Sequence, residues 1–268
     1  MNTALHMVIV IAALFCAFAW VASLLTGDTS WVDRGWSIVP AVYVWVFAAH
    51  AHMHNGRLNL MAIVVTLWAL RLTFNFARKG GYSGLEDYRW QVLRDGMTKW
   101  QFQLFNFFFI VLYQNFILVL IALPALTAYD HQNKKFGPWD IALGLLFVLF
   151  LLGETIADQQ QWNFHKKKHA DIALGKKPES NFLTTGLFSV SRHPNYFCEV
   201  AQWWVLFLMG AYAAGSLTQW TVAGAVLLTI LFIGSTRFTE QISLSKYPEY
   251  AQYQRSTAAV IPFLKFRR

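Results

Sequence analysis

Seven long apolar stretches constrain this chain more than any other feature, because a membrane-spanning helix needs about 20 largely apolar residues. The stretches are 5–25, 36–51, 60–76, 104–128, 139–160, 196–212 and 219–235. Only 13% of the residues are charged, whereas soluble domains carry roughly a quarter. The sequence therefore predicts an all-α integral membrane protein with about seven transmembrane helices, forming a single multi-pass domain over residues 1–268.

The Lys and Arg residues fall unevenly on the two sides of the seven predicted helices. Eighteen lie on one side, three lie on the other, and Arg71 lies within a helix. Because cytosolic loops are rich in Lys and Arg, we expect the N-terminus outside and the C-terminus in the cytosol. The expected location is a bacterial inner membrane, or the endoplasmic reticulum membrane in a eukaryote. The net charge of +8 is thus assigned to topology and to contacts with membrane lipids, not to nucleic acid.

The densest polar run, Ser191-Arg192-His193-Pro194-Asn195-Tyr196-Phe197-Cys198-Glu199, leads into the sixth apolar stretch. Arg192 can bind a phosphate or carboxylate through two hydrogen bonds. Asn195 and Glu199 are four residues apart and share a helix face, and Tyr196 can stack on a flat ring. Charged groups at a membrane boundary need partners, so we expect a charged cofactor here, on the cytosolic side. The structural alternative is an Arg-His anchor with a paired Glu.

A second polar set ends the fifth apolar stretch. Glu154, Asp158 and Gln161 recur there at helical spacing, and intramembrane carboxylates are functional candidates. Three lysines, 166–168, follow. Alone they indicate a lipid-facing basic run, but beside a polar helix end they can also hold a nucleotide phosphate.

The first half of the chain offers candidates for substrate chemistry. Arg71 lies deep in its predicted helix and needs a partner, for which Asp33 is the expected residue; a structural and a substrate role are equally open. Tyr43 and Tyr82 are further hydrogen-bond donors, the latter in a loop with three glycines. The chain has no nucleotide-binding fingerprint of the GxGxxG or GxxxxGK[ST] type, and we expect no metal site.

Several motifs in the second half form a specific combination. They are Gly186-Leu187-Phe188, Ser191 to Phe197 with Glu199 and Trp203, Tyr247-Pro248-Glu249-Tyr250, Tyr253 and Ile261-Pro262-Phe263. Together they resemble the steroid 5α-reductase C-terminal superfamily, and more narrowly its DUF1295 branch, which Asp33-Arg34 with Trp36-Ser37 and Pro40 also resembles. The resemblance is strong over 154–263 and weaker over 30–120. Arg-His-Pro alone is shared with isoprenylcysteine and phospholipid methyltransferases.

The resemblance implies a seven-helix membrane enzyme that binds NADPH from the cytosol. Such an enzyme reduces a carbon–carbon double bond conjugated to a carbonyl in a lipid-like substrate, either steroid-like or isoprenoid. By motif, Asn195 and Glu199 would contact the nicotinamide-ribose end of the cofactor. The full set of expected cofactor-binding residues is Asp158, Gln161, Lys168, Arg192, His193, Asn195, Tyr196, Glu199, Arg237, Tyr250 and Tyr253.

This chain also departs from that pattern. Steroid reductases resemble one another in a Glu on the second helix and a Tyr on the third, which grip the substrate carbonyl; both are missing here, and Cys198 stands where Gly is usual. The candidates for substrate contact or proton donation are Tyr43, Asp33, Arg71 and Tyr82, and the sequence does not choose among them. We expect residues 1–128 to form the substrate-side helices and 139–268 the cofactor-binding half.

Two other function classes fit part of the sequence. The Arg192-His193-Pro194 motif also fits an S-adenosylmethionine-dependent methyltransferase of a lipid or prenylated substrate. A non-enzymatic lipid-binding or transport protein would carry polar residues through the whole membrane depth. Here they concentrate at the expected cytosolic ends, which favours a one-sided cofactor pocket.

Overall fold

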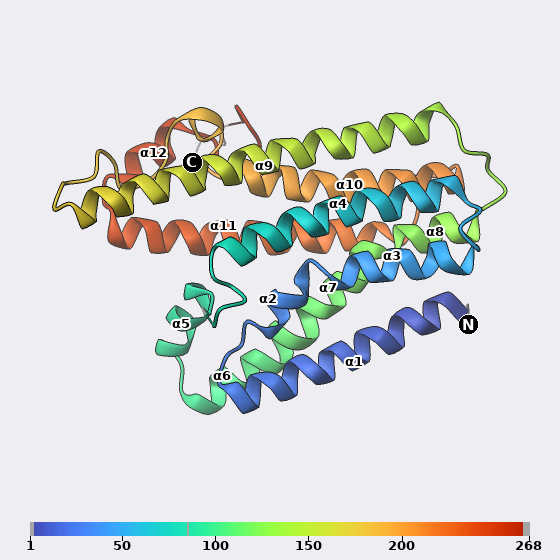
Figure 1. The fold of residues 1–268 in the computed structure, drawn as a ribbon, viewed down its shortest axis with the longest axis horizontal. Coiled ribbons are helices and arrows are strands. Elements are labelled where there is room, and N and C mark those ends of the chain that lie inside the picture. Colours follow the sequence, from blue (N-terminus) through green and yellow to red (C-terminus); the bar gives the residue numbers. More distant parts are fainter. Residues whose placement is uncertain (1–2, 85, 265–268) are drawn as a thin grey trace. The chain divides into compact units, whose positions relative to one another are not determined.

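The structure is a computed structural model that describes residues 3–84 and 86–264, and this part of the chain is helical throughout, without a named strand (Figure 1). In chain order its helices are α1 (Thr3–Thr26), α2 (Trp31–Trp36), α3 (Val39–His50), α4 (Gly56–Arg78), α5 (Tyr88–Asp95), α6 (Lys99–Phe105), the π-helix η1 (Asn106–Tyr113), α7 (Gln114–Ala122), α8 (Pro124–Asp130), α9 (Pro138–Ala173), the 3₁₀-helix η2 (Gly186–Ser189), α10 (Pro194–Ala214), α11 (Val222–Lys246) and α12 (Tyr250–Ser256). The predicted all-α class is confirmed.

Six helical segments of the described residues are long and apolar enough to cross a membrane. They are Thr3–Thr26, Gly56–Arg78, Lys99–Asp130, Pro138–Ala173, Pro194–Ala214 and Val222–Lys246. The chain is therefore a multi-pass membrane protein, and its exposed apolar side chains suit contact with membrane lipids. The predicted helix at 36–51 is the exception to the expected seven.

That second predicted stretch forms α3, which has 12 residues. A helix of this length rises about 18 Å, well short of the roughly 30 Å hydrocarbon core. Pro40 explains its late start, because a proline ring clashes with the carbonyl four residues earlier and keeps α2 from continuing into α3. After α3, His52 and Met53 adopt left-handed φ values of 53° and 58°, which end the helix.

The chain divides into two compact units, each described here by itself. Unit 1 comprises Met1–Leu145 and Trp203–Leu228, and unit 2 comprises Leu146–Gln202 and Thr229–Arg268. Because the boundaries fall inside α9, α10 and α11, these three helices contribute residues to both units.

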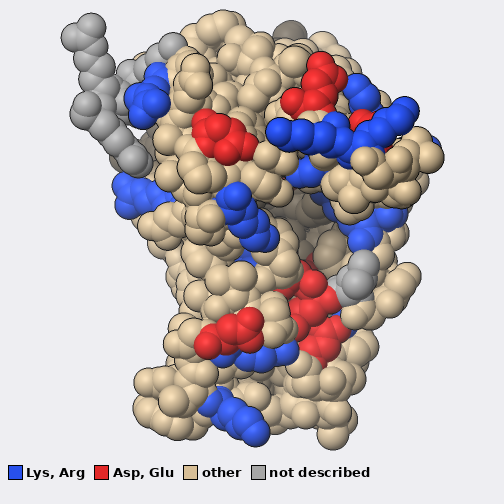
Figure 2. Space-filling model, turned by 90° about the vertical axis from the view of Figure 1, so that its left-hand side faces the viewer, with Lys and Arg blue, Asp and Glu red and all other residues tan. Residues whose placement is uncertain are grey.

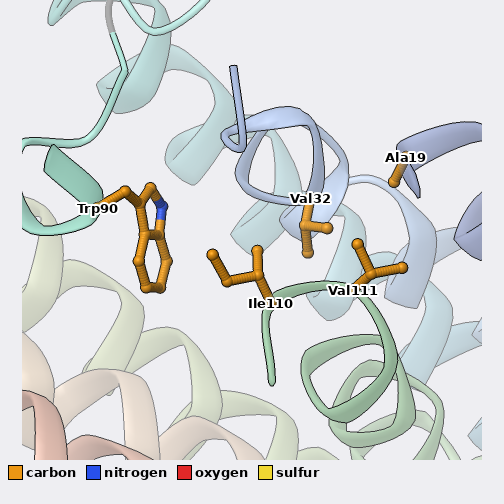
Figure 3. Packing of buried hydrophobic residues seen from close by; sticks show 5 residues of the cluster. All are labelled: Ala19, Val32, Trp90, Ile110 and Val111. Atoms are coloured by element: carbon orange, nitrogen blue, oxygen red, sulfur yellow. The ribbon is translucent and has the colours of Figure 1, made fainter. Parts of the chain in front are cut away.

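Unit 1 has a core in which short helices pack onto long ones. Figure 3 shows Trp90 of α5 and Ile110 of η1 facing one another, with Val32, Ala19 and Val111 as the other members of the buried cluster. The Trp90 indole donates a hydrogen bond of 2.8 Å to the Asp33 carboxylate. The segment around α5 is thereby anchored to α2.

Buried polar groups also hold unit 1 together. Arg57 of α4 and Asp140 of α9 form an ion pair at 2.5 Å that is almost fully removed from solvent. The same guanidinium donates to the carbonyl oxygens of Lys134 and Lys135 at 3.3 and 3.2 Å. Every charged atom of this pair thus has partners, as a buried ion pair requires.

Candidate functional site

Arg192 lies at the start of α10, in unit 2, and is saturated by partners from the end of the chain. Its guanidinium forms a two-bond ion pair with Glu240 of α11, at 2.6 and 3.0 Å. It also donates to the carbonyl oxygen of Gln254, at 2.9 Å, and to that of Thr257. Both charged side chains are buried, with exposed fractions of 8% and 7%. Arg192 therefore joins three segments: the entry to α10, α11 and the residues after α12.

Glu240 is the centre of this network, which we call the Glu240 network. Besides Arg192, its carboxylate has His193 Nε2 at 3.2 Å and accepts a 2.8 Å hydrogen bond from the Gln254 amide. The His193 ring stacks on Tyr196, with ring centroids 5.1 Å apart. Sequence analysis missed Glu240 because it lies just beyond the predicted end of the seventh helix, at 235, and was assigned to the tail. A carboxylate on a helix of otherwise apolar character was the available signal.

Backbone hydrogen bonds fix the same tail to the entry of α10. The Arg192 and His193 amides donate to the carbonyl oxygens of Ala258 and Ala259, at 2.8 and 3.0 Å. The Ser191 hydroxyl donates to the Val260 carbonyl at 2.6 Å. The run of polar residues at 191–193 thus docks residues 258–260 in this fold.

Two tyrosines of α12 complete the docking. The Tyr253 hydroxyl donates to the carbonyl oxygen of Phe188 at 2.5 Å, and the Tyr250 ring packs edge-on against Phe182, 4.9 Å between centroids. Burial raises the pKa of both phenols, so both remain neutral at physiological pH. They can donate hydrogen bonds but carry no charge.

Facing sides of α9 and α10 carry a layer of buried polar side chains, here called the polar layer. It consists of Glu154, Asp158, Asn195, Glu199 and Gln202, of which all but the half-buried Asn195 are buried. Within it, the Asn195 amide donates to Asp158 at 3.2 Å and the Gln202 amide donates to Glu154 at 2.7 Å. The structure therefore brings together Asp158, Asn195 and Glu199, three of the expected cofactor-binding residues, on one pair of helices.

Several buried oxygen atoms of unit 2 have no hydrogen-bond partner among the described residues. They are Oε1 of Gln161, Oε1 of Gln202 and the hydroxyls of Thr236 and Thr239. Gln202 is completely buried, with an exposed fraction of 0%. Buried polar atoms without partners are uncommon in folded proteins and call for a ligand or water. A ligand that donates hydrogen bonds would satisfy the two amide oxygens.

The remaining expected cofactor residues lie nearer the surface of unit 2. Lys168 donates to the Asn181 carbonyl at 2.7 Å and to the Tyr247 hydroxyl at 3.3 Å, and Arg237 is exposed on α11. A hollow of about 370 Å³ adjoins Tyr253, and its lining residues include Phe182, Thr184 and Ser256. Cationic and hydroxyl groups are thus available at the surface as well as within the helices.

The four substrate-side candidates belong to unit 1. Tyr43 is completely buried and its hydroxyl has no hydrogen-bond partner within the described ranges, whereas the Tyr82 hydroxyl donates to the Arg34 carbonyl at 3.0 Å. The partner that the structure gives Asp33 is Trp90, while sequence analysis expected Arg71. Of the two tyrosines, Tyr43 is the one whose hydroxyl donates to no described residue.

The electrostatics around Asp33 are shared with its neighbour in space, Asp87. Burial and the charge of Asp87 raise the pKa of Asp33. Burial also acts to raise the pKa of Asp87. Hydrogen bonds from Arg89 and its positive charge have the larger effect, so the pKa of Asp87 is lowered. Asp33 is accordingly the carboxyl group of this pair that takes up a proton first as the pH falls.

Charged side chains of both signs gather on the face of the molecule drawn in Figure 2. Lys and Arg stand next to Asp and Glu there. Ion pairs such as Arg94 with Glu86, at 2.6 Å, show that some of these basic side chains have acidic partners nearby.

Comparison with known proteins places the chain in a family. Residues 19–257 match the family described as "Protein of unknown function (DUF1295)". The chain belongs to the DUF1295 family. An uncharacterised protein of Schizosaccharomyces pombe is 41% identical to this DUF1295 protein over 261 residues, which cover 91% of the chain and 76% of that relative. The predicted DUF1295 membership is confirmed.

A second relative is the cobalt-zinc-cadmium resistance protein CzcN of Cupriavidus metallidurans. It is 27% identical to this DUF1295 protein over 156 residues, which cover 57% of the chain and 63% of CzcN. No solved structure matches the chain. In the described part of the chain, no group of three or more His, Cys, Asp and Glu side chains has the arrangement of a metal site.

Proposed function

We propose that this DUF1295 protein is an NADPH-dependent membrane reductase. Its substrate would be a lipid-like molecule, steroid-like or isoprenoid, with a carbon–carbon double bond conjugated to a carbonyl. The observation that carries the proposal is the polar layer of α9 and α10. In it, three buried carboxylates, the buried Gln202 and the half-buried Asn195 lie in helices long enough to span a membrane. Such groups are costly in an apolar setting and are functional candidates for that reason.

The polar layer fits the nicotinamide-ribose end of the cofactor. A carboxamide and ribose hydroxyls donate hydrogen bonds, and the unpartnered oxygens of Gln161 and Gln202 accept them. Carboxylates such as Glu199 bind ribose hydroxyls in the same way. Asn195 offers both a donor and an acceptor, which suits the carboxamide. These residues would hold and orient the cofactor.

The cofactor phosphates need cations, and unit 2 offers them outside the polar layer. Arg237 is exposed, and Lys168 stands near the end of α9 together with Lys166 and Lys167. Arg192 is already saturated by Glu240 and two carbonyl oxygens. We therefore assign Arg192 to positioning the tail and assign phosphate binding to Arg237 and Lys168.

When bound, NADPH would supply a hydride to the substrate. The protein's part is then to stabilise the negative charge that develops on the substrate carbonyl oxygen, which requires a hydrogen-bond donor in a dry surrounding. Tyr43 is the strongest candidate, because its buried hydroxyl has no described partner. Its neutral phenol can donate a hydrogen bond and, in the complete reaction, a proton.

We also propose that the Lys/Arg-rich side is cytosolic and that the cofactor enters from there. The support is the 18-to-3 distribution of Lys and Arg together with the positive-inside rule. With the N-terminus outside, this topology needs an odd number of crossings, so α3 and its flanking residues would provide a seventh crossing in addition to the six long helical segments.

The test compares the melting temperature of the purified full chain with NADPH and with S-adenosylhomocysteine. A ligand at a hundred times its Kd stabilises the folded state by about 2.7 kcal/mol. NADPH should raise the melting temperature, and Asn195→Ala should reduce that shift. Gln241→Ala, an exposed position on α11, should leave the shift unchanged. The absence of any shift at millimolar NADPH would overturn the proposal.

One observation favours a second candidate function. Carboxylates dominate the polar layer, and a cationic ligand is better matched to them than an anionic one. S-adenosylmethionine carries a sulfonium and an ammonium group, so a lipid methyltransferase is the alternative. A shift with S-adenosylhomocysteine and none with NADPH would select it, and a shift with neither would leave a lipid-binding role without enzymatic activity.

A further inference from the structure

A small cavity lies in unit 1, apart from all residues proposed to contact cofactor or substrate. Its volume is about 180 Å³. It is lined by residues from the end of α1 and the loop after it, from the end of α5 and from α6, among them Thr29, Arg94, Lys99, Phe102 and Gln103. This is smaller than the roughly 300–1,000 Å³ of pockets for drug-sized ligands. The size suits a compact group such as a phosphodiester and excludes a dinucleotide.

Arg94 is held rigidly at this cavity. Its Nη2 atom donates to Glu86 at 2.6 Å and to the Gly27 carbonyl at 3.2 Å, and its guanidinium lies 4.8 Å from the centre of the Phe102 ring. Neither Nε nor Nη1 has a hydrogen-bond partner within the described residues. The side chain therefore has two donor groups left for a ligand, in an orientation fixed by the protein.

The cavity also carries a positive charge that the fold does not neutralise. Glu86, the nearby carboxylate, already accepts hydrogen bonds from the Thr29 amide and hydroxyl, at 2.9 and 2.7 Å, as well as from Arg94. Among the described residues, none forms an ion pair or hydrogen bond with the Lys99 ammonium. An anion at this place would gain both Lys99 and the open edge of Arg94.

Two exposed apolar stripes begin beside the cavity. On α1, Phe18, Val21 and Leu25 are exposed, and Leu25 reaches 81%. On the segment from α6 into η1, Trp100, Leu104 and Phe108 recur every four residues and are exposed, one position after the cavity-lining Lys99 and Gln103. Helix α1 packs against η1 and α7, so both stripes run along neighbouring helices.

We propose that this cavity binds the phosphate of an anionic glycerophospholipid, whose acyl chains lie along the two stripes. Lys99 and Arg94 supply the charge-assisted hydrogen bonds, and the exposed Trp100 occupies the position at the membrane interface that tryptophan favours. This lipid site lies in unit 1 and is independent of the reaction proposed for this protein. The ligand is a membrane lipid and not a free phosphate, because a free phosphate would leave both apolar stripes uncovered.

The test is native mass spectrometry of the detergent-solubilised full chain, titrated with phosphatidylglycerol, phosphatidylcholine or glycerol 3-phosphate. Phosphatidylglycerol should bind most tightly, because its headgroup carries a net negative charge. Lys99→Ala should weaken that binding about tenfold, as expected for the loss of one hydrogen bond to a charged group. Lys176→Ala removes an exposed lysine of unit 2 and should leave binding unchanged.

A second variant separates the lipid from its phosphate. Trp100→Ala should weaken phosphatidylglycerol binding and leave any weak binding of glycerol 3-phosphate as it is. Melting curves without lipid will show whether either variant is misfolded; an intact Lys99→Ala that binds phosphatidylglycerol like the parent protein would refute the proposal. Equal affinity for phosphatidylcholine, or tighter binding of glycerol 3-phosphate than of the lipid, would refute it as well.

Discussion

Neighbouring residues of the 191–199 run have different tasks in this fold. Arg192 and His193 turn toward Glu240 and fix the end of the chain, whereas Asn195 reaches Asp158 of α9. The same run therefore contributes to the stability of unit 2 and to its polar layer. Mutations within it should separate into two classes, which stability and ligand-binding measurements can distinguish.

Arg192→Ala should belong to the stability class. It leaves the buried Glu240 carboxylate without its ion-pair partner, and breaking a buried pair in this way costs about 3–5 kcal/mol. Chemical denaturation of the purified protein would measure the loss of unfolding free energy. Arg255→Ala, an exposed arginine of α12, is the control and should change stability by less than about 0.5 kcal/mol. Equal effects of the two variants would contradict the assigned role.

Asp33→Asn should change how stability depends on pH. Because the folded-state pKa of Asp33 is raised above its ordinary value of 3.8, the protonated carboxyl stabilises the fold. That contribution is complete below the ordinary pKa and is lost as the pH rises through the folded-state pKa. The neutral Asn keeps an acceptor for Trp90. The melting temperature of the variant should therefore rise relative to that of the parent protein between pH 4 and pH 7.

The matched control for this pH series is Asp95→Asn, which alters an exposed carboxyl group. Its difference from the parent protein should stay constant over the same range. A melting-temperature difference for Asp33→Asn that shrinks as the pH rises would show that the charged form of Asp33, not the neutral one, is favoured by the fold.

The residue types predicted much of the candidate site, but not which residues its side chains contact. Asp158, Asn195 and Glu199 were selected because carboxylates and amides are costly within apolar helices, and the structure does gather them. Glu240 was missed, and Asp33 received Trp90 in place of Arg71. The role of Glu240 and the pairing of Asp33 with Trp90 both depend on contacts between residues more than 45 positions apart. The local spacing of residue types does not predict such contacts.

At the scale of elements, close helix packing in unit 1 depends on glycines. A Cβ atom at Gly210 of α10 would meet the backbone of Pro124, and one at Gly224 of α11 would meet the carbonyl of Leu120. Backbone atoms of α7 and α8 therefore approach these helices as closely as small residues permit, which is how transmembrane helices pack in the absence of a hydrophobic driving force.

Gly224→Ala should be destabilising for this reason. The added methyl group meets backbone, which moves little, so a cost of about 1–3 kcal/mol is expected. Gly234→Ala in the same helix has nothing within reach of its Cβ and should be neutral or slightly stabilising, since alanine favours helix. Thermal unfolding of both variants checks this pair, and a larger loss for Gly234→Ala would contradict it.

The apolar stretches predicted six of the long helices because length and hydropathy decide them. They predicted a spanning helix at 36–51 but not the shortness of α3, which Pro40 and the left-handed residues after the helix limit to 12 residues. They also did not predict the π-helix η1 inside the fourth stretch. Helix breaks depend on single residues and on tertiary contacts, whereas hydropathy averages over a window.

At the scale of the whole molecule, the division into two units separates the two sets of candidates. Tyr43, Asp33, Arg71 and Tyr82 belong to unit 1, and all eleven expected cofactor residues belong to unit 2. Substrate turnover and cofactor affinity are therefore expected to respond to different halves of the candidate list. Variants of Tyr43 should leave NADPH affinity intact while abolishing turnover of an enone.

The proposed topology can be tested with single cysteines. In a Cys16→Ser, Cys198→Ala background, Lys176→Cys should react with a membrane-impermeant maleimide only after the cytosolic side is opened. Lys135→Cys should react from the outside in intact cells. Both positions are exposed on loops or helix ends. Labelling of both from the same side would contradict the odd number of crossings.

The most direct test of the account is a fluorescence titration of NADPH into the purified full chain, compared with the Glu199→Gln variant. The polar layer should bind the cofactor with a measurable Kd, and the variant should bind at least tenfold more weakly because a buried charged acceptor is lost. A parent protein that shows no saturable binding, or a variant with an unchanged Kd, would contradict the claim that α9 and α10 hold a dinucleotide.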